Sequence, residues 1–226
     1  MNERIFLLAA LAVLVLVSGH RDDSIGAVSA QSNPAMNFFV SSAKSKTGNL
    51  GGLRGADRVC QLLASAVGIG GKSWRAYLSV ERDSDNDNKP TDARSRIGAG
   101  PWSNANGVVI AKDLAELHAR KGDADLFVDE RGQRIPGNWP ESPKPTEHDI
   151  MTGSTPEGRV MAGRTCNDWT SGAADVQGQV GHSDGLGPGG DPSGRYSSWN
   201  SSHDNASCAD TAPRGGAGRI YCFAAK

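Results

Sequence analysis

Three histidines in the second half of the chain each lie within two positions of an aspartate. The pairs are His148 with Asp149, His182 with Asp184, and His203 with Asp204. Imidazole nitrogens and carboxylate oxygens are zinc ligands, and an aspartate can also orient a histidine that binds the metal. None of these histidines has the helical H-x-x-x-H spacing, so the fold would have to bring three ligands together. We expect surface or loop-bracing histidines, with His182, Asp184 and His203 as candidate zinc ligands in the alternative.

The segment 181–185 reads Gly-His-Ser-Asp-Gly and formally matches G-x-S-x-G, the nucleophile elbow of serine hydrolases. That elbow needs a buried strand before the serine and a helix after it. Residues 186–190 read Leu-Gly-Pro-Gly-Gly, which cannot form a helix, so the required context is missing. A zinc-dependent or serine hydrolase that uses His182, Asp184 and His203 is therefore kept as an alternative, and a non-enzymatic protein is the first hypothesis.

An acidic segment offers a second candidate metal site. Asp83, Asp85 and Asp87 alternate as in a calcium-binding loop. However, Asn88 replaces the glycine that the sharp turn of such a loop needs, and Arg94 stands where the bidentate glutamate should be. We expect a solvated polar loop here, with a calcium ion as the alternative.

The first 30 residues predict a secretory signal. An apolar run from Ile5 to Val17 follows Arg4, and Val28-Ser29-Ala30 provides small residues for cleavage. We expect 31–36 to be a short tether and 37–226 a single domain. Cleavage after Gly19, or retention as an anchor, is the alternative, although the run is short of the about 20 residues that a membrane span needs. The prediction is a secreted, periplasmic or cell-envelope protein without stable membrane insertion after cleavage.

Charge and cysteine content narrow the class further. Without the leader, 22 basic and 22 acidic residues remain, which is no electrostatic footprint for nucleic acid or an anionic membrane. The cysteines all lie in the exported part, where an even number favours two disulfides: Cys60, Cys166, Cys208 and Cys222. Zinc binding by cysteine is disfavoured because no pair has C-x-x-C spacing.

Hydrophobic periodicity predicts an α+β fold in which about half of the chain lies in loops. Apolar residues at three- and four-residue steps predict a helix over 56–67, and Asp113 can cap a second, brief helix through residue 118. Alternation predicts a half-buried strand over 74–80, and residues 126–135 suggest a hairpin. Shorter strands are expected at 38–40 and 108–110, and Trp102 and Trp139 anchor the loops around them.

Several motifs together resemble the C-type lectin-like fold, and more specifically secreted bacterial lectin-like proteins related in fold to endostatin. They are Gly48-Asn49-Leu50-Gly51-Gly52-Leu53, Gly55-Ala56-Asp57 with Cys60, the run 93–118 with Gly100-Pro101-Trp102, His148-Asp149-Ile150, 166–171, and Tyr221-Cys222-Phe223. The resemblance covers nearly all of 37–226. It implies two short helices, small antiparallel sheets and long stapled loops, with Cys60 joined to Cys222 and Cys166 to Cys208.

In C-type lectins a calcium ion held by the long loop and a Trp-Asn-Asp strand binds the sugar. Trp199-Asn200 matches, but Ser201 stands in place of the aspartate, and the nearest relative of the loop triplet is 191–193, Asp-Pro-Ser. The resemblance therefore implies a sugar-binding fold without the standard calcium site. Trp199 as a core anchor and Asn200 as a turn residue are the alternative.

These observations lead to a secreted, non-enzymatic recognition domain whose loop 171–207 binds a glycan or an extracellular-matrix ligand. Stacking on an aromatic ring and hydrogen bonds from amides and carboxylates are what a sugar requires. The candidate ligand-binding residues are Asp184, Asp191, Tyr196, Trp199 and Asn200. A hydrolase, or a structural envelope or adhesion module that contacts protein, is the alternative.

Overall fold

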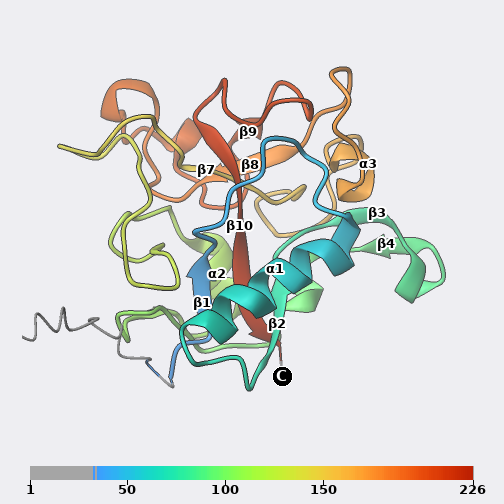
Figure 1. Ribbon diagram of the computed structural model, residues 1–226. Helices are drawn as coiled ribbons and strands as arrows, with labels where there is room; N and C mark the ends of the chain where they lie inside the picture. The colour runs from blue at the N-terminus through green and yellow to red at the C-terminus, as the bar shows by residue number, and fades with distance from the viewer. Residues whose placement is uncertain (1–32, 34, 226) are drawn as a thin grey trace, which may run out of the picture.

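The computed structural model describes residues 33 and 35–225, so the expected signal segment lies outside the described residues. This part of the chain is α+β, with three helices, small sheets and two disulfides, as Figure 1 shows. The helices are α1 (Gly52–Ala66), α2 (Leu114–Ala119) and α3 (Cys166–Trp169). The sequence predicts the first two; α3 is an addition. Asp113 caps α2 as expected, because its carboxylate accepts a hydrogen bond from the backbone N–H of Glu116.

Six strands form the main sheet, in the order β1-β10-β7-β8-β9, and β2 also pairs with β10. Their bounds are β1 (Phe38–Val40), β2 (Ser73–Ala76), β7 (Asp149–Met151), β8 (Gln179–His182), β9 (His203–Asp204) and β10 (Gly216–Ala225). Two hairpin-like pairs complete the fold: β3 (Val80–Asp83) with β4 (Lys89–Thr91), and β5 (Trp102–Ser103) with β6 (Val109–Ala111). Among the described strands of the main sheet, β10 and β7 pair in parallel and the other pairs are antiparallel.

Strand β10 runs through the middle of the molecule, with α1 across one half of it and β7, β8 and β9 at the other end (Figure 1). Its side chains alternate between two cores. Ile220 and Cys222 pack with the apolar face of α1, whereas Tyr221 and Phe223 pack into an aromatic core. That second core contains Trp102, Phe127 and Trp199. The period of two that defines a strand thus divides the buried side chains between both sides of the sheet.

Two expected elements differ in detail. The strand predicted over 74–80 is divided, because alternation holds only over Ser73–Ala76. Tyr77, expected on the polar side, is completely buried, and its ring packs against that of Trp199 at an interplanar angle of 48°. The predicted hairpin at 126–135 is reduced to a single bridge between Val128 and Arg134. Tyr77 is buried in the aromatic core and not on the polar side that the alternation predicts. The alternation of neighbouring residues carries no information about this long-range packing.

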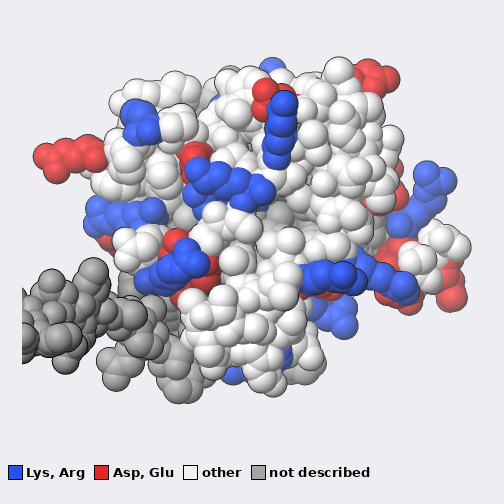
Figure 2. Space-filling view, viewed as in Figure 1, with Lys and Arg blue, Asp and Glu red and all other residues white. Residues whose placement is uncertain are grey.

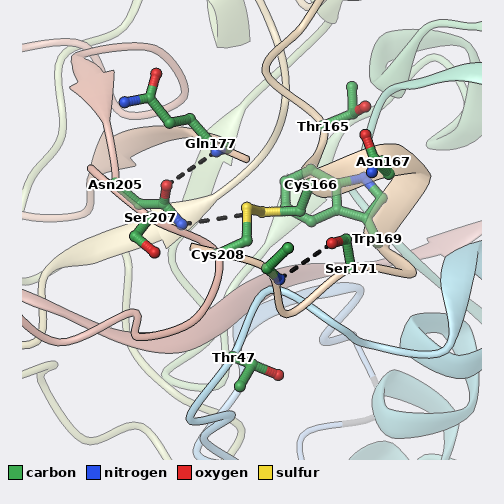
Figure 3. Close-up of a disulfide and its surroundings, with 12 residues drawn as sticks. Thr47, Thr165, Cys166, Asn167, Trp169, Ser171, Gln177, Asn205, Ser207 and Cys208 are labelled. Carbon is green, nitrogen blue, oxygen red and sulfur yellow. Dashed lines mark hydrogen bonds between the residues drawn. A yellow bond between two sulfur atoms is a disulfide. The ribbon is translucent and has the colours of Figure 1, made fainter. Parts of the chain in front are cut away.

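The disulfides join Cys60 to Cys222 and Cys166 to Cys208, which confirms the pairing that the resemblance implies. The first ties α1 to β10. Figure 3 shows the second beside the Trp169 ring. Gly48 lies directly against it, since a Cβ at that position would be 2.3 Å from Cys166 Sγ. Both ends of the long loop are therefore closed inside a packed environment.

Helix α3 is a single left-handed turn. All four of its residues have positive φ, between 49° and 63°. Backbone groups around it hold this conformation: Trp169 N–H donates to Thr165 O at 2.7 Å, Ser171 N–H to Cys166 O at 3.0 Å, and Leu50 N–H to Trp169 O at 2.8 Å. Such a turn is unfavourable for non-glycine residues, so the disulfide and the buried Trp169 ring are what maintain it.

No helix within residues 35–225 is both long enough and apolar enough to span a membrane. On the face shown in Figure 2, basic and acidic side chains are intermixed.

The two disulfides should differ in their contribution to stability. They connect residues 162 and 42 positions apart, and in the chain-entropy description closure of these loops stabilises the fold by about 5 and about 4 kcal/mol, respectively. We expect Cys60→Ser to lower the free energy of unfolding by about 1 kcal/mol more than Cys208→Ser. Urea denaturation of both variants measures the difference; equal losses would contradict it.

The left-handed turn gives a second test. Asn167 is exposed and has φ 51°, a conformation that glycine adopts without a steric cost. We expect Asn167→Gly to be more stable than Asn167→Ala by about 1 kcal/mol in chemical denaturation. Exposed Leu62 in α1 is the matched control, because in a right-handed helix alanine is favoured over glycine and the order must reverse. The same order at both positions would rule out strain in α3.

Candidate metal centre

Strand pairing brings three of the sequence-predicted residues to one end of the main sheet. In the antiparallel register of β7 and β8, Asp149 lies opposite His182. His203 in β9 lies opposite Val180, two positions from His182 along β8 and therefore on the same face. His148 immediately precedes β7 and joins the same cluster. We call His148, Asp149, His182 and His203 the histidine cluster.

The Nε2 atoms of the three histidines surround one carboxylate oxygen. Asp149 Oδ1 is 3.2 Å from Nε2 of His182, 3.4 Å from that of His148 and 3.6 Å from that of His203. The rings of His148 and His182 stack with their centroids 4.1 Å apart, and the His203 ring stands edge-on to His182. Four potential ligand atoms thus converge on one small volume.

Burial makes this arrangement costly without a further positive charge. The side chains of His148, Asp149 and His182 are only 2–3% exposed, whereas that of His203 is 21% exposed. Despite the short distances, neither oxygen of Asp149 has a hydrogen-bond partner. A buried carboxylate without hydrogen bonds or a counter-charge is strongly disfavoured.

The hydrogen bonds of the outer ring nitrogens, Nδ1, determine which nitrogen of each histidine carries the proton. Nδ1 of His182 faces Leu186 O at 2.8 Å, and Nδ1 of His203 faces Asp204 O at 2.8 Å. A carbonyl oxygen only accepts, so each Nδ1 must donate, and the neutral ring then carries a lone pair on Nε2. Yet the Nε2 atoms of His182 and His203 are only 2.8 Å apart. Two facing lone pairs beside a carboxylate require a cation, either a proton shared between the two nitrogens or a metal ion that lies to one side and binds both.

Asp184 supports the cluster from outside. Its Oδ1 accepts a hydrogen bond from His148 Nδ1 at 2.7 Å, which directs the His148 Nε2 lone pair inward. Burial raises the pKa of Asp184, but the hydrogen bonds from His148 and from the backbone N–H groups of Asn138 and Leu186 outweigh it, so the pKa lies below its usual value. The absence of a side chain at Gly137 leaves room for the Asp184 carboxylate, because a Cβ there would be 2.3 Å from Asp184 Oδ2.

A cavity of about 650 Å³ opens above the cluster. His148, His182 and His203 line it, so the cluster borders the cavity. The Tyr196 ring is nearly parallel to that of His182, at 6° and 5.7 Å between centroids. The remaining lining residues are Asn138, Thr146, Pro188, Gly189, Asp204, Arg214 and Gly215.

The ligand set of this centre suits zinc. His148, Asp149 and His182 have ligand atoms within 4.8 Å of one another, and they are the one such group among the described residues. Imidazole favours zinc and other late transition metals, whereas calcium requires several oxygen ligands. His203 provides a fourth ligand of the same kind, and the Asp184–His148 pair has the geometry of an outer hydrogen bond to a metal-bound histidine.

The structure gives the predicted zinc ligands different positions. His182 and His203 lie together, while the carboxylate of Asp184 contacts the outer nitrogen of His148. Asp149 occupies the centre instead. The adjacent pair His148-Asp149 is visible in the sequence, but its position opposite His182 depends on the β7–β8 register, which no local pattern contains.

The predicted ligand-binding residues are also separated. Trp199 and Asn200 are completely buried, and the Asn200 amide donates to Tyr77 Oη, Thr155 O and Pro156 O. Their side chains therefore form part of the core, which agrees with the anchor alternative for Trp199. Tyr196 faces the cavity, whereas Asp191 is exposed and bonds to Ser193.

The two other motifs do not build a comparable site. Ser183 is buried, with only 1% of the residue exposed, and its hydroxyl has no hydrogen-bond partner among the described residues. Asp85 pairs with Arg54, and Asp83 accepts hydrogen bonds from Thr91 and from the backbone of Asp85. A substrate does not reach Ser183 in this conformation.

The chain matches no described protein family, and no curated protein shows significant similarity to it.

Replacement of the central carboxylate should separate metal binding from stability. Asp149→Asn keeps the side-chain shape, and its amide can donate to the lone pairs that the carboxylate cannot satisfy. We expect the metal-free variant to melt above the metal-free wild-type protein. Zinc at about 100 times its Kd should stabilise the wild-type protein by about 2.7 kcal/mol and the variant far less. Thermal denaturation with and without zinc measures both effects.

His118→Ala is the matched control, because His118 contacts Tyr77 Oη and lies outside the cluster. This variant should lose stability but still bind one zinc ion per chain, as measured by elemental mass spectrometry. Equal zinc affinity of the Asp149→Asn and wild-type proteins would reject the site.

Proposed function

We propose that this protein is an exported, non-enzymatic recognition domain of C-type lectin-like fold, which binds a glycan through a zinc ion at the floor of the 650 Å³ cavity. The observation that carries the proposal is the buried, unpaired carboxylate of Asp149 beneath an open cavity, surrounded by three imidazole lone pairs. A dication there satisfies all four groups and keeps one side towards the cavity.

The two disulfides support the proposed fold and location. One joins the first long helix to the last strand and the other closes the long loop, as the lectin-like resemblance implies. Disulfides are typical of oxidising compartments, which fits a secreted, periplasmic or cell-envelope protein.

The cavity lining favours a sugar-like ligand. Tyr196 offers an aromatic ring next to the His182 ring, and sugar rings stack on such surfaces. Asn138 and Thr146 also line the cavity and provide polar groups for hydroxyls. The metal would add coordination of a ligand oxygen, which gives the cavity both an apolar and a polar contact.

Recognition is favoured over hydrolysis because none of the described residues that line the cavity is positioned as a general base. A zinc hydrolase of this kind needs a carboxylate or imidazole that can accept a proton from the attacking water. The cavity-lining carboxylate outside the cluster is Asp204, which is engaged by Arg214 at 2.6 Å. The three cavity-lining histidines are committed to the metal.

The function is tested by glycan-array binding of zinc-loaded and chelated protein. We expect binding that requires zinc, is lost in Asp149→Asn and falls at least about tenfold in Tyr196→Ala, because a stacked ring contributes on the order of 1.4 kcal/mol. Tyr196→Phe keeps the ring and is the matched control, with affinity close to wild type. Glycan binding that persists after chelation, or none in either state, would reject the proposed function.

A further inference from the structure

A second positive group lies beside the histidine cluster. Arg214 lines the cavity and is followed by Gly215, whose carbonyl accepts a hydrogen bond from Asp149 N–H at 3.1 Å. Gly215 has φ 106°, and a Cβ there would be 3.4 Å from His148 Nε2. The backbone next to Arg214 thus lies directly against two residues of the cluster.

Arg214 is also tied to the third strand of the site. Its Nη1 donates to Asp204 Oδ1 at 2.6 Å and to Asp204 O at 3.1 Å, and Asp204 follows His203 in β9. The guanidinium side chain is 48% exposed, so it is only partly covered by this pair. Within the described residues, the hydrogen bonds of the Arg214 side chain both come from Nη1. The planar fork leaves Nη2 and Nε oriented to donate elsewhere.

His203 differs from the other members of the cluster. Its side chain is 21% exposed, against 2–3% for the others, and it comes from a two-residue strand at the edge of the sheet. His148, Asp149 and His182 form the compact three-ligand group without it. An incoming oxygen would therefore reach the metal on the His203 side, where Asp204 and Arg214 also lie.

We infer that the ligand presents a carboxylate to this cavity, with one oxygen on the metal at the His203 side and the other on the Arg214 guanidinium. This inference rests on the proposed function. A carboxylate has two oxygens in the spacing that a guanidinium recognises, so it can place one negative oxygen on the metal and accept hydrogen bonds with the other from the Arg214 N–H groups that Asp204 does not use. A neutral hydroxyl could coordinate the metal but would leave Arg214 without an anionic partner from the ligand.

Matched acid and neutral probes test the inference on the zinc-loaded protein by calorimetry. Glucuronate against glucose tests a sugar acid, and N-acetylglycine against its amide tests a peptide C-terminus. We expect the acid to bind at least about tenfold more tightly than its neutral partner in one of the pairs, the factor that one charge-assisted pair provides. No preference in either pair, or no binding of any probe, would overturn the inference.

Arg214→Gln should reduce that preference to less than about threefold while zinc affinity is retained, because the guanidinium contacts the ligand and not the ion. Arg134→Gln is the matched control: Arg134 is 46% exposed, pairs with Asp125, and lies outside the cavity lining. A preference that survives in Arg214→Gln would overturn the inference. Zinc-dependent binding of a neutral glycan would overturn it too, yet leave the proposed function intact.

Discussion

The burial of strand β10 on both faces is the constraint from which the rest of the structure follows. Ile220 and Cys222 face α1, and Tyr221 and Phe223 face the aromatic core. Because neither face meets water, the backbone groups of β10 have to be paired by other strands. β1 and β2 pair with one end of it and β7 with the other. A chain rich in loops therefore has one rigid axis, and the histidine cluster is attached to the end where β7 begins.

The attachment of β7 to β10 explains why the Asp149 carboxylate is buried where no described group donates a hydrogen bond to it. Gly216 in β10 lies opposite Asp149, and a Cβ there would be 3.5 Å from Asp149 Cβ and 2.2 Å from Thr211 O, so the space beside Asp149 is tightly packed. Sheet pairing thus fixes the position of Asp149 whatever its charge state. The outer hydrogen bonds of the surrounding rings then leave lone pairs on the inner side. Packing creates the electrostatic cost, and a cation held by the same four side chains, as we propose, would remove it.

The sequence predicts the parts of this arrangement that depend on local pattern. The spacing of apolar residues such as Ala56 and Cys60 predicts the buried face of α1, and the position of Asp113 just before α2 predicts its capping role. The three His-Asp pairs identify the residue types of the site. Their roles are not predictable in the same way: Asp184 is closer to His182 in sequence, yet Asp149 is the carboxylate opposite it, through a register that joins residues 33 positions apart. Long-range pairing of this kind leaves no periodic signal along the chain.

Trp199-Asn200 shows how the lectin-like interpretation and the metal centre fit together. In the resemblance this dipeptide belongs to a calcium-binding strand, but here the Trp199 indole donates to Leu117 O and the Asn200 amide holds Thr155 and Pro156. Both side chains are buried and brace loops. Three residues after Asn200, His203 points into the cavity. In the proposed function, a serine at 201 and a histidine at 203 favour imidazole ligands that suit zinc over the several oxygen ligands that calcium requires.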